Sequence, residues 1–314
     1  MIVLFDDVKK EDIPNAALLK LRMFLDKNEP ELVEFLQTLW NAQGRAITYK
    51  ELREAIMAGY ISEEILAEWH RDYSKFVIDY IEPKWRAAME AANEPIKRYG
   101  TVWNFDSDAA GVREWNKANA ARFVTFVNND QRAAINYVVQ RASQMHDFNV
   151  DSLSRVIRPM VGLNYRQAAA NLNYYETMIE SGMNERKAME RSIRYSSRQS
   201  RYRGYLIART ELAFSYNQGA YLGTLQAQEA GLLGPCQKVW CTADDERTCE
   251  YCGQLEGVAL DMETDFYYND KKKGPTRINP RLKYSKPVGK VPPAHPNCRC
   301  TIIYEELSPP IIEM

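Results

Sequence analysis

The sequence is poor in the residues that most often carry chemistry. Its 314 residues include only three histidines, and all six cysteines lie between Cys236 and Cys300, so the first 235 residues contain no thiol. We find no Ser–His–Asp arrangement, no glycine-rich loop that could cradle a phosphate and no pair of catalytic carboxylates. These absences argue against most classes of enzyme, and they confine any thiol-based metal site to the last quarter of the chain.

Long hydrophobic runs are also missing. No apolar stretch approaches the ~18 residues of a membrane span, and the opening MIVLF is broken at once by Asp6 and Asp7, so we expect neither a signal peptide nor an anchor. The net charge of −1, with 45% hydrophobic and 26% charged residues, is ordinary for a globular protein and excludes a disordered or collagen-like chain. We therefore expect a protein made in the cytoplasm, where thiols stay reduced and clustered cysteines indicate metal before disulfide.

Up to about residue 230 the apolar residues recur at helical spacing, which predicts an all-α body. Thr48-x-x-Glu51 and Asn164-x-x-Gln167 have the pattern of capping boxes, which begin helices. Proline and glycine suggest where helices start, kink or stop, with Pro30 at a helix start and a break or kink at Pro83. The expected helices cover about 18–25, 32–40, 49–59, 62–99, 108–127, 129–146, 165–181, 184–201 and 204–230.

The residue pattern of the sequence changes after Gly231. Residues 237–242 and 299–304 have the composition of β-strands, and a stretch rich in proline, glycine, lysine and asparagine lies between them. We place a domain boundary near residue 232. The chain then divides into a helical N-terminal region of unknown role (1–150), a second helical part (151–231) and a C-terminal α+β module (232–314).

A cysteine–histidine constellation is the most informative feature of that module. Cys249-Glu-Tyr-Cys252 supplies two thiols at the spacing that binds one metal ion from a tight turn, and His295-Pro-Asn-Cys298-Arg-Cys300 supplies a second pair. Two such pairs complete a tetrahedral zinc site, and a site closed by four protein ligands is structural rather than catalytic. The predicted fold class is therefore mainly α, with a long-helix body followed by a small zinc-stabilised α+β module.

Five candidate ligands compete for four positions. On one face of a strand, Cys298 and Cys300 would lie roughly 6.6 Å apart. The sequence does not choose between them, and we favour Cys298 because it shares the Pro-Asn turn with His295. We expect Cys236 and Cys241 to be packing residues, since neither has a partner at ligand spacing.

Other readings of the cysteines remain open. The simplest is a set of buried thiols with a chance Cys-x-x-Cys. A redox Cys-x-x-Cys would need a βαβ setting that the sequence lacks. A zinc deaminase would need His-x-Glu before its cysteine pair, whereas here the order is reversed and the glutamate is absent.

Two basic tracts could contact nucleic acid. One is an arginine face at spacings of 3, 4 and 3, which falls on one side of a helix with Tyr202 and Tyr205 close by. The other lies in the loop that the metal would close and continues to Lys290. Both could bind phosphates without sequence preference, the arginine face could instead meet an acidic protein surface, and the plain alternative is a solvated surface. The candidate residues are Arg191, Arg194, Arg198, Arg201, Lys271, Lys272 and Lys273.

Arg209-Thr210-Glu211 contains the residue types used in ADP-ribosyl transfer. The three residues lie at successive positions in a predicted helix, so their side chains point in different directions. We therefore expect a buried Arg–Glu network that joins the helical part to the zinc module.

Taken together, these motifs resemble the head morphogenesis family of tailed bacteriophages, the Mu protein F-like minor head proteins. The resemblance covers roughly residues 150–304 and includes Gly162-Leu163 and Arg166-Gln167 in the helical lead-in. The motifs that carry it are Ala208-Arg209-Thr210-Glu211, Asn217-x-Gly219, Trp240-x-Thr242-x-x-Asp245-x-x-Thr248-Cys249-x-x-Cys252 and Pro292-Pro293-x-His295-Pro296-Asn297-Cys298-Arg299-Cys300.

The resemblance implies a minor capsid protein, present in few copies and without enzymatic activity, whose head morphogenesis module begins with the helical part 151–231. The implied partners are the portal protein, a scaffold or major capsid protein, and double-stranded DNA. The implied location is the host cytoplasm during assembly and then the inside of the virion head.

Two other functions compete with this one. A nuclease or toxin-like RNase could use His295 as its acid–base group and the basic loop to hold phosphate. The chain could also be a plain sequence-independent nucleic-acid-binding protein. Zinc stoichiometry separates the enzyme from the other two, because a histidine nitrogen bound to metal cannot act as a free general base.

Overall fold

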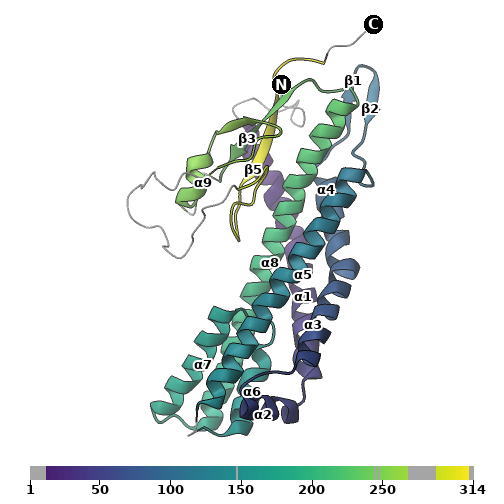
Figure 1. Ribbon diagram of the computed structural model, residues 1–314. Coiled ribbons are helices and arrows are strands. Elements are labelled where there is room, and N and C mark those ends of the chain that lie inside the picture. Colours follow the sequence, from purple (N-terminus) through teal and green to yellow (C-terminus); the bar gives the residue numbers. More distant parts are fainter. Residues whose placement is uncertain (1–11, 146–147, 244, 247, 268–287, 311–314) are drawn as a thin grey trace. The chain divides into compact units, whose positions relative to one another are not determined.

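The computed structural model describes residues 12–145, 148–243, 245–246, 248–267 and 288–310. Helices dominate this part of the chain (Figure 1), which confirms the mainly α fold class. The α-helices are α1 (Ile13–Ala46), α2 (Tyr49–Ala58), α3 (Glu63–Phe76), α4 (Glu82–Ala91), α5 (Ala110–Ser143), α6 (Val150–Ile157), α7 (Tyr165–Glu180), α8 (Glu185–Glu229) and α9 (Glu250–Leu255). Within the described ranges, no helix is both long enough and apolar enough to cross a bilayer.

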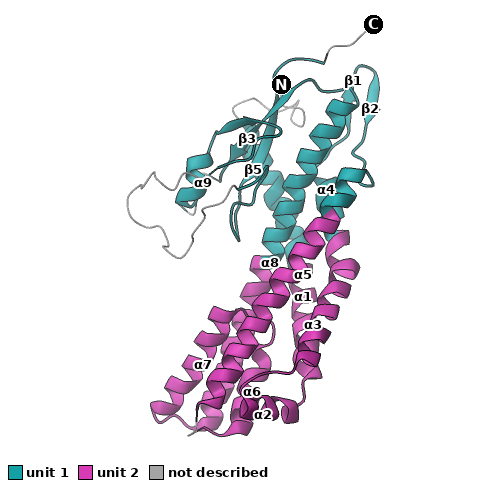
Figure 2. Cartoon of the chain, viewed as in Figure 1, with its two compact units in different colours: residues 1–29, 84–115, 207–314 teal, residues 30–83, 116–206 magenta. Residues whose placement is uncertain are grey.

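The chain divides into two compact units, each built from separate stretches of sequence (Figure 2). Unit 1 comprises residues 1–29, 84–115 and 207–314, and unit 2 comprises residues 30–83 and 116–206. Helices α1, α5 and α8 each contribute residues to both units. The boundary predicted near residue 232 falls inside unit 1, so independent folding of the segment 232–314 stays a prediction.

Both predicted capping boxes are present in unit 2. Thr48 caps α2 and accepts a hydrogen bond from the Glu51 backbone N–H, while the Glu51 carboxylate accepts one from the Thr48 backbone N–H. Asn164 and Gln167 form the same reciprocal pair at the start of α7. The helices that these caps begin bury their apolar faces in one core shared by α2, α3, α5, α6, α7 and the start of α8.

Several predicted helix breaks are wrong, because the helices continue through them. Pro30 lies inside α1 rather than at a helix start. The buried positions Leu21, Leu25, Leu32 and Leu36 keep helical phase on both sides of it. The Asn28 side chain also donates to the Phe24 carbonyl at 2.8 Å, so a side chain supplies a hydrogen bond in the turn beside the proline.

Two further pairs of predicted helices are single helices. The expected gap near residue 128 lies inside α5, where Asp130 forms an ion pair with Arg203 at 2.8 Å instead of ending the helix. The expected gap near residue 203 lies inside α8, which continues through Gly204 with the Arg203 side chain paired to Asp130.

The helix expected over 62–99 is interrupted and ends early. A π-helical turn, η2 (Val77–Ile81), precedes α4, whose second residue is Pro83, so the expected break takes the form of a widened turn. A hairpin of β1 (Ile96–Arg98) and β2 (Thr101–Trp103) follows α4. Its two loop residues, Tyr99 and Gly100, have φ of 50° and 74°, the pattern of a type I′ turn.

The C-terminal part of unit 1 contains a three-stranded antiparallel sheet of order β4-β3-β5. Its strands are β3 (Cys236–Cys241), β4 (Ala259–Asp261) and β5 (Thr301–Glu306), with Cys241 opposite Thr301. The start of α1 packs on this sheet, where Ile13 and Ala17 share a small core with Ile303. The cysteine-bearing segments therefore flank a sheet that is anchored to a long helix.

Candidate metal centre

The first pair of candidate ligands lies at the start of the short helix α9. Cys249 is its N-cap residue, and the Cys249 Sγ accepts a hydrogen bond from the Cys252 backbone N–H at 3.4 Å. Cys252 lies one turn further on and is buried. A cap position followed by one helical turn brings two thiols to the same end of a helix, which is the local geometry that Cys-x-x-Cys requires.

The second pair lies in a tight turn just before β5. The Cys298 backbone N–H donates to the His295 carbonyl at 3.1 Å, and Asn297 between them has a φ of 63°. The His295 Nδ1 lies 2.9 Å from the Pro296 carbonyl oxygen, which can only accept, so Nδ1 carries the proton. This contact fixes the imidazole and leaves Nε2 as the atom that can bind a metal ion.

The two pairs converge on one another. The His295 Nε2 lies 3.1 Å from the Cys249 Sγ and 3.2 Å from the Cys252 Sγ. The Cys252 Sγ lies 3.7 Å from the Cys298 Sγ. The fold thus brings together side chains more than 40 residues apart in the sequence, as the spacing of the two pairs predicts.

Three of the six ligand–ligand distances are close to those of a tetrahedral zinc site. With Zn–S bonds of about 2.3 Å and Zn–N bonds of about 2.05 Å, the edges of the tetrahedron are about 3.8 Å between sulfurs and about 3.6 Å between sulfur and nitrogen. The observed sulfur–sulfur distance of 3.7 Å agrees with the first value, and the sulfur–nitrogen distances of 3.1 and 3.2 Å are shorter than the second by about 0.4–0.5 Å. A small outward movement of the imidazole would accommodate the ion.

Cys300 also reaches this cluster. Its Sγ and those of Cys252 and Cys298 all lie within 4.8 Å of one another. The expectation that Cys298 and Cys300 share one face of a strand is wrong, because β5 begins only at Thr301 and both cysteines lie in the irregular segment before it. The five predicted ligand candidates therefore form two overlapping groups that share Cys252, one with Cys249 and His295 and the other with Cys298 and Cys300, and which four bind metal stays a prediction.

The pKa values of the cysteines and the histidine in the cluster shift because these side chains share protons through hydrogen bonds. The pKa values of Cys249 and Cys298 are lowered, in each case chiefly by a hydrogen bond with the Cys252 thiol, and the pKa of Cys252 is raised by the same contacts. Burial alone would lower the pKa of His295, but its contacts with Cys249 and Cys298 outweigh burial and raise it to about 9. A divalent cation at the centre would replace these shared protons.

Residues around the ligands hold the turn in place. Arg299 forms a bidentate ion pair with Asp245, with nitrogen–oxygen distances of 2.6 and 2.7 Å. Thr210 of α8 accepts a hydrogen bond from the Asn297 backbone N–H at 3.1 Å. At the predicted Arg–Glu network, Arg209 forms an ion pair with Glu29 of α1 at 2.7 Å.

The remaining cysteines and the basic candidates lie elsewhere. Cys236 and Cys241 are buried in β3 and belong to neither group of candidate ligands among the described residues. The arginine face is on α8 in unit 2, and its four side chains are exposed: Arg191, Arg194, Arg198 and Arg201. Lys271, Lys272 and Lys273 lie outside the described residues. Lys290, at the end of that tract, forms an ion pair with Glu263 at 2.5 Å.

Comparison with known protein families supports the resemblance that the motifs indicate. Residues 169–303 match the family described as "Phage Mu protein F like protein". No curated protein and no solved structure matches the chain. The matched segment contains all five candidate ligands and the Ala-Arg-Thr-Glu motif, which contacts the turn at Asn297. The resemblance drawn from the sequence is therefore confirmed for residues 169–303.

Proposed function

We propose that this protein is a minor head protein of a tailed bacteriophage, which acts in head morphogenesis and contains a structural zinc site. The observation that carries the proposal is the pair of overlapping candidate-ligand groups, Cys249–Cys252–His295 and Cys252–Cys298–Cys300, within the matched residues 169–303. Four protein ligands leave no open position for substrate, so the metal's contribution is to folding. The ion would hold α9 against the turn before β5 and thereby close the long segment between them.

The geometry favours a structural role for His295 over a catalytic one. Its Nδ1 is engaged by the Pro296 carbonyl, and its Nε2 faces two thiols at 3.1 and 3.2 Å. A nuclease or toxin-like RNase would need one of these nitrogens to exchange a proton with substrate. This contact pattern supports a non-enzymatic protein.

The partners follow from the family resemblance. We propose the portal protein as the principal partner, a scaffold or major capsid protein as a further contact, and assembly in the host cytoplasm before enclosure in the virion head. The test is to co-express the chain with the tagged portal protein of the same phage and to ask whether the two copurify. An unrelated portal protein is the control. Absence of the folded chain from the cognate portal fraction would contradict the proposal.

Contact with double-stranded DNA is the second element of the proposal, and the exposed arginine face of α8 supports it. Each neutralised phosphate should contribute about −0.9 to the slope of log K against log salt. Replacing Lys271, Lys272 and Lys273 with alanine should flatten that slope by up to about 2–3 units and leave zinc content unchanged. DNA binding that does not depend on salt, or a salt slope that substitutions in neither basic tract change, would show that both tracts are only solvated surface.

A further inference from the structure

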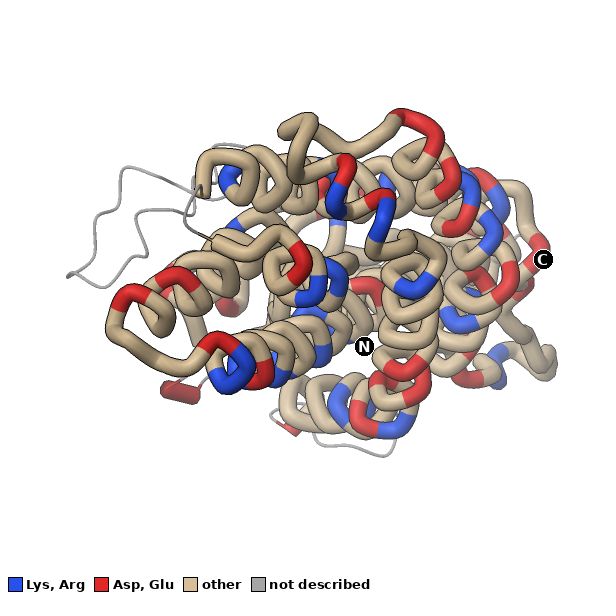
Figure 3. Tube along the Cα trace, turned by 90° about the horizontal axis from the view of Figure 1, so that it is seen from below, with Lys and Arg blue, Asp and Glu red and all other residues tan. Residues whose placement is uncertain are grey.

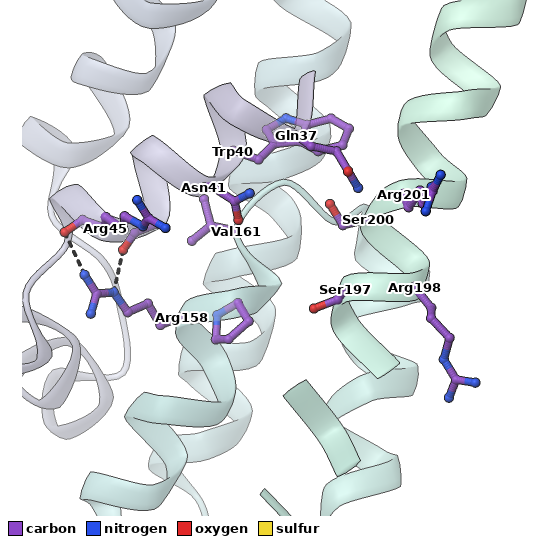
Figure 4. A pocket seen from close by; sticks show the side chains of 12 residues that line it. Gln37, Trp40, Asn41, Arg45, Arg158, Val161, Ser197, Arg198, Ser200 and Arg201 are labelled. Carbon is purple, nitrogen blue, oxygen red and sulfur yellow. Dashed lines mark hydrogen bonds between the residues drawn. The ribbon is translucent and has the colours of Figure 1, made fainter. Parts of the chain in front are cut away.

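A pocket in unit 2 is lined by residues of which only Arg198 and Arg201 have been assigned a role above (Figure 4). It has a volume of about 530 Å³ and lies where the end of α1, the 3₁₀ turn η3 (Arg158–Met160) and α8 meet. The middle of α8 supplies two residues of the arginine face to its wall, Arg198 and Arg201. Part of the predicted basic face is thus one side of a concave site formed by three elements.

The charge around the pocket has one sign. Four of its lining residues are arginines, namely Arg45, Arg158, Arg198 and Arg201, and no lining residue is acidic. Elsewhere on the helices basic and acidic residues are interspersed (Figure 3). Among the described residues none of these four guanidinium groups has an ion-pair partner, whereas the neighbouring Arg194 lies 3.8 Å from Glu190. Such a site attracts an anion.

One of the four arginines is held in place by the backbone of α1. The Arg158 Nε donates to the Gly44 carbonyl and its Nη2 to the Arg45 carbonyl, both at 2.7 Å. The same guanidinium lies 4.6 Å from the centre of the Tyr49 ring. Its position is therefore fixed before any ligand arrives, and a preorganised guanidinium loses little entropy when it binds an oxyanion.

Neutral hydrogen-bonding groups line the space between the helices. Figure 4 shows the Ser197 and Ser200 side chains of α8 extending toward α1, where Gln37 and Asn41 carry amide groups, while the Arg198 guanidinium points away from α1 at the rim. Hydroxyl and amide groups inside a basic rim are suited to a phosphate ester, whose oxygens accept from both. The volume exceeds what one phosphate fills and leaves room for an attached sugar and base.

We propose that this pocket binds a phosphate ester of nucleotide size. Its source is either a free nucleotide or a nucleotide of a nucleic-acid strand, and the phosphate contact is the same in both. The proposal rests on unit 2 alone and depends neither on the metal centre nor on the role in head assembly.

Two pairs of substitutions on α8 test it with the same change of charge. Arg198→Gln with Arg201→Gln removes two rim charges, and Arg191→Gln with Arg194→Gln removes two charges of the same face outside the pocket. The probes are inorganic phosphate and thymidine 5′-monophosphate, measured by isothermal titration calorimetry on the full chain. We expect the first pair to weaken thymidine 5′-monophosphate binding by about tenfold or more and the second by less than about twofold.

A third variant, Ser200→Leu, fills the pocket and keeps every charge, and it should also weaken binding of thymidine 5′-monophosphate. Far-UV circular dichroism and the thermal midpoint confirm that each variant is folded. A (dT)₁₂ oligonucleotide that binds more tightly than the mononucleotide, with a salt slope of about −0.7 per phosphate, identifies a strand as the source; equal affinities identify a free nucleotide. Equal losses from the two arginine pairs, or no binding of either phosphate probe by the wild-type chain, would overturn the proposal.

Discussion

Asn297, in the turn between His295 and Cys298, accepts a hydrogen bond from Arg209 of α8: the Arg209 Nη1 lies 3.3 Å from the Asn297 Oδ1. The other nitrogens of this guanidinium contact the Glu29 carboxylate of α1 at 2.7 and 3.1 Å. The Ala-Arg-Thr-Glu and His-Pro-Asn-Cys motifs are therefore in direct contact. Through Arg209, two long helices brace the turn that carries His295 and Cys298.

Substitutions at Asn297 should separate the contribution of its hydrogen bond with Arg209 from the contribution of its backbone conformation. Asn297→Gly removes the hydrogen bond from Arg209 but permits the φ of 63°, so we expect it to lower the free energy of unfolding by about 1–2 kcal/mol and to speed zinc release to a chelator. Asn297→Ala should cost about 1 kcal/mol more, because alanine is strained at positive φ. Urea unfolding and chelator competition measure the two effects. Wild-type zinc release from the glycine variant would show that Arg209 does not brace the site.

The fourth zinc ligand can be identified by two matched substitutions. Because Cys298 lies in the same turn as His295, 3.7 Å from the Cys252 Sγ, we expect Cys298→Ser to lower the zinc content or affinity sharply and Cys300→Ser to leave one zinc per chain. Cys236→Ser, at a buried cysteine outside both candidate groups, is the control for the loss of a buried thiol. Zinc retained in the Cys298 variant and lost from the Cys300 variant would assign the position to Cys300.

An ion pair in unit 1 predicts an acid-sensitive contribution to stability. Burial tends to raise the pKa of Glu306, but hydrogen bonds from Arg98, at 3.0 Å, and from the Gly234 backbone N–H outweigh it and lower the pKa below the usual 4.5. A lowered pKa stabilises the fold above about pH 4.5, and this contribution is lost as the pH falls through the pKa of the folded state.

Glu306→Gln should therefore lower the thermal midpoint at pH 7, and its difference from wild type should shrink as the pH falls from 5 to 3. Glu229→Gln, at an exposed position on α8, is the control. A difference between Glu306→Gln and wild type that stays constant across this range would contradict the assigned ion pair.

Local signals in the sequence were sufficient for much of the helical body. The capping boxes at Thr48 and Asn164 were predicted correctly because cap and partner lie three residues apart, within reach of one turn. The breaks at Pro30 and near residues 128 and 203 were wrong because distant residues decide them. Asp130 of α5, for example, pairs with Arg203 of α8, 73 residues away.

At the candidate site, too, local patterns could be predicted from the sequence and contacts between distant residues could not. The spacing of Cys249, Cys252, His295 and Cys298 predicted their convergence, since metal-ligand pairs have a short local pattern. Glu29, a carboxylate partner of Arg209, is 180 residues away and leaves no trace in the local sequence. The pocket was missed for the same reason: only the fold brings Arg45 and Arg158 to the arginine face of α8.

The zinc content of the purified wild-type chain shows whether the proposed zinc site exists. Elemental analysis of protein prepared without chelator should give one zinc per chain, because two thiolates at the start of α9 and a histidine with a thiolate in the turn before β5 would supply the four ligands of a structural site. Removing the ion with EDTA should lower the thermal midpoint of the metal-loaded protein. A zinc content near zero, together with a thermal midpoint that EDTA does not change, would show that the chain has no structural zinc site.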